Sequence, residues 1–281
     1  MSGIESDLHC CDAQSVLCGG IGSNPSTHPG QADRTATLDV PVNREVAHGV
    51  YSSIAHFGPK QPLIMGIASK LKLFWTAGRG VVTGMAEATE SADPIELFGN
   101  WFTAATDSGI LLPEAMTLST ATPGGIPSSR MVLLKGYGPD GFVFFTNYGS
   151  KKASELDENP VAALLFHWPI LQRQVRIEGR VGKISEAESS AYFATRDRGS
   201  QVGAWASRQS EELENRSELE KRVKEVETRF EGNDVPRPAF WGGYRVSPIA
   251  IEFWQGRVSR LHDRVRFARD ADHWHATRLY P

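Results

Sequence analysis

The stretch from Ser129 to Asn147 constrains the fold of this chain more than any other segment. It contains two runs rich in β-branched and aromatic residues, which the sequence Gly-Pro-Asp-Gly at residues 138–141 separates. Such a sequence favours a tight turn between two antiparallel strands. We therefore predict a β-hairpin here, around which the other elements are arranged.

Basic side chains flank the predicted hairpin. Arg130 and Lys135 lie at the two ends of its first strand. Lys151 and Lys152 follow its second strand, directly after Ser150, which is a favourable helix N-cap. Because side chains alternate along a strand, Arg130 and Lys135 should point to opposite faces unless a bulge intervenes. These cations suggest anionic ligands, with a phosphate at the helix after Ser150; the alternative is simple solvation at a strand edge.

The composition is that of an ordinary soluble domain with additional sequence. The chain has 281 residues, of which 40% are hydrophobic and 22% are charged. Its 30 basic and 33 acidic residues give a net charge of −3, so a nucleic-acid partner is not expected. The most apolar early run, residues 63–75, contains two lysines and is too short to span a membrane.

Three cysteines, Cys10, Cys11 and Cys18, all lie near the start of the chain. We therefore expect neither a disulfide framework nor a metal site, and infer a reducing compartment such as the cytoplasm. Residues 1–90 lack a sustained hydrophobic period, which predicts a mostly disordered extension with a short amphipathic piece at residues 64–74. The folded domain is predicted to span residues 91–281.

Within that domain the sequence predicts a mixture of helices and antiparallel strands. Asp93 and Pro94 open an amphipathic helix that ends near Thr106. The apolar run at residues 161–168 predicts a strand buried on both faces, and the alternation at residues 172–184 predicts a half-buried strand. Other predicted elements are a strand at 115–121, a helix at 150–158, a loop at 235–244, and final strands at 245–254, 259–268 and 274–280.

Two apparent capping boxes, at Ser185 and Ser217, predict the starts of two further helices. The first should end near Arg196, where residues 197–200 break it. Antiparallel strands with helices inserted between them, without a strand-helix-strand rhythm, favour an α+β barrel with peripheral helices.

Arg260, His262 and Arg264 stand at alternate positions of a predicted strand, so their side chains should leave the same face. Two arginines beside a histidine repel each other unless an anion lies between them, which suggests a ligand site. The alternative is that the histidine is structural.

Tyr192 and Arg196 are one helical turn apart and should share a face, with Ser200 just beyond the helix end. The pattern suits an anion site, but it is also typical of a surface arginine that stacks on a tyrosine.

Several motifs follow one another along the last two-thirds of the chain. They are Arg-Met-Val-Leu-Leu-Lys-Gly at 130–136, Phe-Phe-Thr-Asn at 144–147, Arg-Gln-Val-Arg-Ile-Glu-Gly at 173–179, Trp-Gly-Gly-Tyr at 241–244, Glu-Phe-Trp-Gln-Gly at 252–256 and Arg-Leu-His-Asp-Arg at 260–264. In this order they resemble the pyridoxamine 5′-phosphate oxidase family. The resemblance implies an FMN-binding split β-barrel, Greek-key-like, that forms a homodimer with flavin at the subunit interface. It also implies oxidation of pyridoxine 5′-phosphate or pyridoxamine 5′-phosphate to pyridoxal 5′-phosphate, with O2 as acceptor and hydrogen peroxide as product.

The resemblance also implies roles for individual residues. Arg260 and His262 match the catalytic pair over the substrate ring, with Leu261 between them. The substrate phosphate would be held by Lys135, Tyr192, Arg196 and Ser200. The FMN contacts would be Arg130, Met131, Val132, Leu133, Phe145, Thr146, Lys151, Lys152, Gln174, Gln209, Ser210, Trp241 and Arg264.

Two departures from the family pattern stand out. No Arg-x-x-Tyr segment, which folds over the substrate in the family, precedes Asp93, and Lys151 stands where the family often has arginine. Two other functions therefore stay open. One is a flavin reductase acting on a substrate without a phosphate, and the other is a non-catalytic protein that binds flavin or pyridoxal phosphate.

Overall fold

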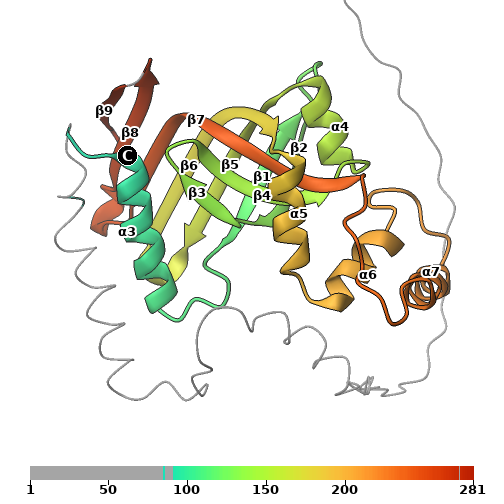
Figure 1. Ribbon diagram of the computed structural model, residues 1–281. Helices are drawn as coiled ribbons and strands as arrows, with labels where there is room; N and C mark the ends of the chain where they lie inside the picture. Colours follow the sequence, from blue (N-terminus) through green and yellow to red (C-terminus); the bar gives the residue numbers. More distant parts are fainter. Residues whose placement is uncertain (1–84, 86–90, 272) are drawn as a thin grey trace, which may run out of the picture. The chain divides into compact units, whose positions relative to one another are not determined.

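The computed structural model describes Met85, residues 91–271 and residues 273–281 (Figure 1). The expected extension at residues 1–90, with its amphipathic piece, lies outside the described residues except for Met85. The Met85 side chain is 3% exposed and packs in the main hydrophobic core. Its carbonyl accepts a hydrogen bond from Arg278 Nη2 at 3.4 Å.

One nine-stranded antiparallel sheet forms the centre of the domain, which confirms the predicted α+β class. Its main order is β2-β1-β5-β6-β7-β4-β3, and β8 and β9 extend it from β7. The strands are β1 (Ala115–Ala121), β2 (Pro127–Leu133), β3 (Gly136–Gly138), β4 (Gly141–Asn147), β5 (Val161–Trp168), β6 (Arg173–Lys183), β7 (Trp241–Gln255), β8 (Asp263–Asp270) and β9 (His273–Leu279). The helices are α3 (Pro94–Asp107), α4 (Lys151–Glu158), α5 (Glu186–Ala194), α6 (Arg198–Ala206) and α7 (Arg216–Arg229), with 3-10 turns η2 (Pro169–Leu171) and η3 (Val258–Arg260).

The long strand β7 connects the two ends of the sheet. Its first residues pair with β4, its last residues pair with β8, and β6 runs along nearly its whole length. Figure 1 shows β8 and β9 at one end of β7 and α5 at the other. Side chains near Trp241 and side chains near Trp254 therefore belong to different ends of the domain.

Helix α3 forms as its sequence predicts. Asp93 Oδ1 accepts a hydrogen bond from the Ile95 N–H at 2.7 Å, and Pro94 fills the first helical position. The helix buries Phe98 and Trp101 against the sheet. The Phe98 ring lies 4.9 Å from that of Phe142 in an edge-to-face arrangement, which is favourable for aromatic pairs.

The predicted hairpin between Ser129 and Asn147 is wrong in its pairing, although its turn is correct. Gly138 pairs with Gly141 across the turn, but the strand that this turn joins to β4 is the short β3, and the other neighbour of β4 is β7. Strand β2 pairs instead with β1. The change of partner occurs where the Leu134 N–H bonds to the Glu114 carbonyl and the Lys135 N–H bonds to the Val143 carbonyl. Leu134 is 5% exposed, so burial of its side chain fixes this crossing.

Three other local predictions are wrong. Strand β5 buries only alternate residues, and Val161 at its start is 41% exposed, so it is not buried on both faces. Residues 241–244 begin β7 rather than a loop, because their backbone pairs with β4. Helix α7 is capped by Asn215 rather than Ser217: Asn215 Oδ1 accepts from the Glu218 N–H at 3.0 Å.

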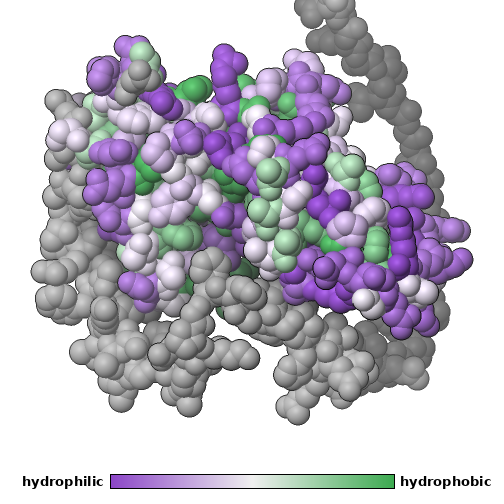
Figure 2. Space-filling model, viewed as in Figure 1, coloured by the Kyte–Doolittle hydropathy of each residue, from purple (hydrophilic) through white to green (hydrophobic). Residues whose placement is uncertain are grey.

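The capping box at Ser185 is confirmed and opens α5. Residues 197–200 do end that helix, but Asp197 also caps α6, which the sequence did not predict. Its Oδ1 accepts from the Ser200 N–H at 2.8 Å, so Ser200 lies in the first turn of α6. Helix α7 packs half-buried Val223, Val226 and Phe230 inward, and hydrophilic residues cover its outer face (Figure 2). Among the described residues, no helix is long and apolar enough to cross a membrane.

Candidate functional site

Lys152 is a buried cation at the start of α4, with 8% of its surface exposed. Its ammonium group donates to Thr146 Oγ1 at 3.0 Å, Ser150 Oγ at 3.0 Å and Gln209 Oε1 at 2.9 Å. Burial and then the nearby charge of Arg130 lower the pKa of Lys152 to about 8. These contacts bring together Thr146, Lys152 and Gln209, three of the residues that the family resemblance assigns to FMN.

Among the described residues, no side chain caps the N-terminus of α4. Ser150 stands at the N-cap position as predicted, but its hydroxyl donates to the Asn147 carbonyl at 2.7 Å instead of accepting from the helix. An uncapped helix start beside a buried lysine favours an anion, because backbone N–H groups and the helix dipole attract negative charge. Lys151 in the same turn is 68% exposed at its side chain.

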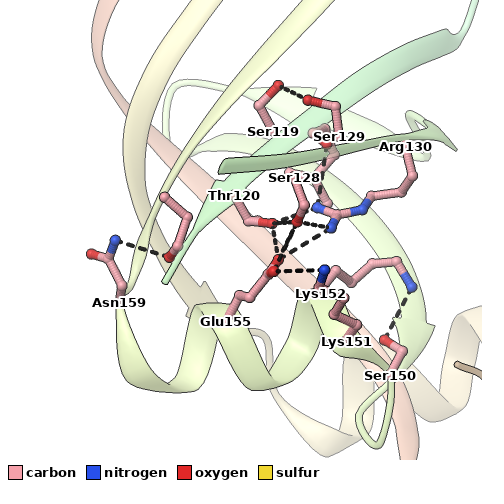
Figure 3. Close-up of polar contacts among 12 residues, drawn as sticks. Ser119, Thr120, Ser128, Ser129, Arg130, Ser150, Lys151, Lys152, Glu155 and Asn159 are labelled. Carbon is pink, nitrogen blue, oxygen red and sulfur yellow. Dashed lines mark hydrogen bonds and ion pairs between the residues drawn. The ribbon is translucent and has the colours of Figure 1, made fainter. Parts of the chain in front are cut away.

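Arg130 reaches α4 from the middle of β2 (Figure 3). Its guanidinium donates to Thr120 Oγ1 and Ser128 Oγ, each at 2.5 Å, and to Glu155 Oε2 at 3.1 Å. Burial raises the pKa of the Glu155 carboxyl, but hydrogen bonds from Ser128, Thr120 and Arg130 outweigh this effect and hold its pKa below the usual value. Arg130 is therefore held in place by a charged carboxylate. Together with Lys151 and Lys152 it forms a group of cations at the start of α4, which we call the Lys152 cluster.

Beyond Arg130, β2 presents an open strand edge. It stands at one end of the strand order, so among the described strands one of its backbone edges has no partner in the ladder. Met131 is 62% exposed, Leu133 is 37% exposed, and Val132 packs against the core between them. Free backbone groups and apolar side chains of this kind suit a flat heterocycle with polar edges.

A second cluster combines aromatic rings with an arginine. The rings of Phe145 and Tyr192 stack with centroids 3.9 Å apart, and Trp241 stacks 5.3 Å from Phe145. The guanidinium of Arg196 lies 4.7 Å from the Trp241 centroid. Burial lowers the pKa of Arg196 and raises the pKa of the Tyr192 hydroxyl.

Arg196 Nη1 is buried and has no hydrogen-bond partner among the described residues. An unpaired buried donor is costly, so such an atom usually marks the place of a ligand or an ordered water. A charged guanidinium is well matched to a phosphate or carboxylate. The Arg196 cluster is therefore a candidate site for the anionic group of a ligand.

The structure connects some predicted residues less closely with this cluster. Lys135 is exposed beyond the end of β2, and Ser210, which has a φ of 79°, is exposed after α6. Ser200 is half-buried in α6 and follows Arg196 in the chain. Within the described residues, no hydrogen bond or ion pair joins Lys135 or Ser200 to Arg196, so their roles stay predictions.

The remaining predicted residues lie at the other end of β7. Gln174 and Arg264 both stand opposite Trp254, on β6 and β8 respectively. Arg264 pairs with the buried carboxylate of Glu252, with Nε and Nη2 each 2.9 Å from Oε1. The His262 ring lies 4.5 Å from that of Trp254.

The predicted row of Arg260, His262 and Arg264 on one strand is wrong. Strand β8 begins only at Asp263, and Arg260 lies in the turn η3. Ser259 and Arg260 have φ values of 58° and 61°, and this left-handed backbone cannot continue a strand. His262 turns back toward the loop, where its Nδ1 accepts from the Arg257 N–H at 3.1 Å.

Two groups of predicted ligand contacts are thus separated within one chain. Trp241 and Trp254 are 13 residues apart on β7, a contour length of about 43 Å at 3.3 Å per residue. Arg196 contacts Trp241, and Lys152 bonds to Thr146, which pairs with Gly242. His262 contacts Trp254, and Arg260 and Leu261 directly precede it in the chain. Figure 1 shows β8 at the end of β7 opposite to α5. One chain does not bring the predicted catalytic pair to the Arg196 cluster.

Sequence reasoning missed Glu155, Thr120, Ser128 and Glu252. Glu155 follows Lys151 at the i,i+4 spacing of a helical ion pair, which was a usable signal. Thr120 and Ser128 flank a turn and face each other across β1 and β2, which only the strand pairing reveals.

Comparison with known proteins identifies the family of this chain. A family model described as pyridoxamine 5′-phosphate oxidase matches residues 102–230, and one described as the pyridoxine 5′-phosphate oxidase C-terminal dimerisation region matches residues 241–281. A pyridoxine/pyridoxamine 5′-phosphate oxidase from Rubrobacter xylanophilus is 60% identical over 198 residues, which is 70% of this chain and 91% of that protein. The chain belongs to the pyridoxamine 5′-phosphate oxidase family.

Other members of the family extend the comparison. The protein of the same name from Psychromonas ingrahamii is 56% identical over 217 residues, which is 77% of this chain and all of that protein. Among solved structures, PhzG from Burkholderia lata 383, in complex with tetrahydrophenazine-1-carboxylic acid, is 32% identical with a TM-score of 0.65, over 69% of this chain and 95% of that one. An FMN-binding protein from Nostoc punctiforme, 16% identical with a TM-score of 0.55 over 68% of this chain and all of that one, shares the fold. The predicted split-barrel fold is confirmed.

Proposed function

We propose that residues 91–281 form an FMN-dependent oxidase of vitamin B6 metabolism. It converts pyridoxine 5′-phosphate or pyridoxamine 5′-phosphate to pyridoxal 5′-phosphate and reduces O2 to hydrogen peroxide, with water consumed and ammonia released from the amine. Relatives of this name that are 52–60% identical support the assignment. The observation that carries it is the buried Nη1 of Arg196, which has no hydrogen-bond partner within the part of the chain that the structure describes and calls for an anionic group beside Trp241 and Tyr192.

The Lys152 cluster fits the phosphate of FMN. Arg130, Lys151 and Lys152 gather at the uncapped start of α4, which suits a phosphate dianion. The open edge of β2 at Met131–Leu133 would hold the isoalloxazine ring. When bound, FMN supplies the two-electron acceptor, and the protein supplies binding and orientation.

The Arg196 cluster would hold the phosphate of the substrate. The contact of Arg196 with Trp241 and the clustering of Tyr192 beside it support this role. We assign Lys135 and Ser200 to the same phosphate on the resemblance to the family. Two separate phosphate sites explain why a chain of net charge −3 concentrates buried cations in two places.

We further propose that each site is assembled from two chains of a homodimer, with FMN at the interface. Arg260 and His262 of a second copy would reach the substrate ring, because those of the same chain lie at the far end of β7. Val258 and Leu261, which are 70% and 69% exposed, provide apolar surface beside them. The family description of residues 241–281 as a dimerisation region supports this arrangement. We also propose a cytoplasmic location, on the sequence argument from cysteine usage.

The direct test is aerobic turnover by purified protein supplied with FMN. We expect pyridoxine 5′-phosphate to give aldehyde and hydrogen peroxide in equal amounts, and unphosphorylated pyridoxine to react far more weakly. Flavin binding without aldehyde formation would contradict the oxidase and favour a reductase or a binding protein. Equal rates with and without the substrate phosphate would contradict the role of the Arg196 cluster.

A further inference from the structure

A buried carboxylate, that of Glu155, lies beside the cations Arg130, Lys151 and Lys152 (Figure 3). Glu155, on the second turn of α4, is 5% exposed. Its Oε2 lies 3.1 Å from Arg130 Nη2, and its Oε1 lies 3.8 Å from Lys151 Nζ. It is less exposed than either of these partners, so it lies deeper than the cations that would meet a ligand.

The hydrogen bonds around Glu155 have a consistent direction. The Thr120 hydroxyl donates to Oε2 at 2.5 Å, and the Ser128 hydroxyl donates to the same carboxylate at 2.6 Å. Each hydroxyl has one proton, so its oxygen is then left to accept from Arg130. Arg130 Nη1 and Nη2 make those two bonds. Glu155 therefore holds the guanidinium of Arg130 directly and through two hydroxyl groups.

The carboxylate also sets the charge of the cluster. Arg130, Lys151 and Lys152 carry three positive charges and Glu155 carries one negative charge, which leaves a net charge of +2. A phosphate monoester carries a charge of about −1.5 to −2 at neutral pH, so the two charges match. The negative charge of Glu155 also raises the pKa of Lys152 and opposes the effect of Arg130.

We propose that Glu155 is the positioning residue of the FMN phosphate site: it fixes Arg130 and adjusts the charge of the cluster to that of a phosphate dianion before the flavin binds. This inference rests on the proposed function. Glu155 does not contact the phosphate, which its charge would repel, and acts through Arg130 and Lys152.

The test compares Glu155→Gln with Glu158→Gln, an equal loss of charge at an exposed position of the same helix. Binding of FMN and of riboflavin to the apoprotein is measured by quenching of flavin fluorescence between pH 6 and pH 9. We expect E155Q to weaken FMN binding about tenfold or more and to leave riboflavin binding unchanged. Loss of the Glu155 charge should lower the pKa of Lys152. FMN binding by E155Q should therefore begin to weaken at a lower pH than FMN binding by the wild type. E158Q should match the wild type.

Ser128→Ala is a second test of how Glu155 holds Arg130, because it removes one of the two connecting hydroxyl groups and keeps the carboxylate. It should weaken FMN binding less than E155Q, with riboflavin binding unaffected, and it decides the matter if circular dichroism shows that E155Q is unfolded. An E155Q variant with the FMN affinity and pH dependence of the wild type would overturn the role of Glu155. If E155Q is unfolded, wild-type FMN affinity in Ser128→Ala would do the same. Neither result would contradict the proposed function. A wild-type protein that binds neither flavin would overturn the proposed function itself.

Discussion

Arg196 lies over the indole ring of Trp241, with the guanidinium carbon 4.7 Å from the ring centroid. This contact joins the segment after α5 to the first residue of β7. Attraction between the cation and the ring holds the guanidinium in place. This contact is not a hydrogen bond, and Nη1 has no hydrogen-bond partner among the described residues. Arg196 is thus positioned while one of its donors stays available to an anion.

Replacing Arg196 by alanine should raise the KM for pyridoxine 5′-phosphate by about 10- to 150-fold, which corresponds to about 1.5–3 kcal/mol for a lost charge-assisted hydrogen bond. FMN should stay bound, because its proposed contacts are elsewhere. Steady-state kinetics and the flavin spectrum measure the two effects. Arg216→Ala on the exposed side of α7 is a control that should leave both unchanged. An unaltered KM in the Arg196 variant would contradict the proposal that Arg196 binds the substrate phosphate.

The affinity for FMN should fall as the pH rises above about 8, the pKa of Lys152 in the free protein. Above that value the ammonium loses its proton, and the phosphate loses a cation. Lys152→Met should bind FMN weakly and lose this pH dependence. Lys151→Met should keep the pH dependence and lose less affinity, since an exposed charge is screened by solvent. Fluorescence titrations across the pH range measure these constants; a pH-independent wild-type affinity would contradict the role of Lys152.

The same pKa has a consequence for the stability of the free protein. Because burial lowers the pKa of Lys152 from 10.5 to about 8, the charged form is the less favourable one in the folded state. Its contribution to the free energy of unfolding should therefore rise as pH increases from about 8 to 10.5. Urea denaturation of the wild type and of Lys152→Met at pH 7.5 and 9.5 measures this contribution. The stability of the wild type relative to the variant should be greater at pH 9.5. A difference between the two proteins that does not change with pH would contradict this linkage.

Local sequence signals were sufficient to predict the boundaries of some elements, but not the partner of β2 or the start of β8. Asp93 and Pro94 identify the start of α3 because their cap and N1 preferences act within the helix itself. The partner of β2 was not predictable, because a turn sequence specifies a reversal but not which strand lies alongside. Burial of Leu134 decides that pairing. Ser259 and Arg260 adopt left-handed backbone without a glycine, so nothing in the sequence indicated that β8 begins later than expected.

The candidate site shows the same division. Motifs predicted Lys152 and Arg196, but the environment of each comes from distant parts of the chain. The contacts of Glu155 could not be predicted, because they form only when β1 and β2 bring Thr120 and Ser128 against α4. The separation of Arg196 from Arg260 depends on the length of β7, which the sequence interpretation shortened by placing residues 241–244 in a loop.

Gly141 should tolerate no larger residue. Its φ is 131°, and an added Cβ would collide with the Val246 carbonyl oxygen on β7. Gly141→Ala should lower the free energy of unfolding by about 2–4 kcal/mol, through backbone strain and overpacking. Gly138→Ala, at the other side of the same turn, has open space at its Cβ and should cost much less. Urea denaturation measures both, and equal effects would contradict this account of the turn.

Assembly of each site from two chains is tested most directly by mixing inactive variants. Arg196→Ala should lose substrate affinity and Arg260→Ala should lose turnover with flavin still bound. After unfolding and refolding together, about half of the dimers should be mixed, and each mixed dimer should contain one intact site with Arg196 from one chain and Arg260 from the other. The mixture, assayed at low pyridoxine 5′-phosphate, should regain about a quarter of wild-type activity. Activity no greater than that of the separate variants, in dimers shown to have exchanged chains and to hold FMN, would contradict a shared site.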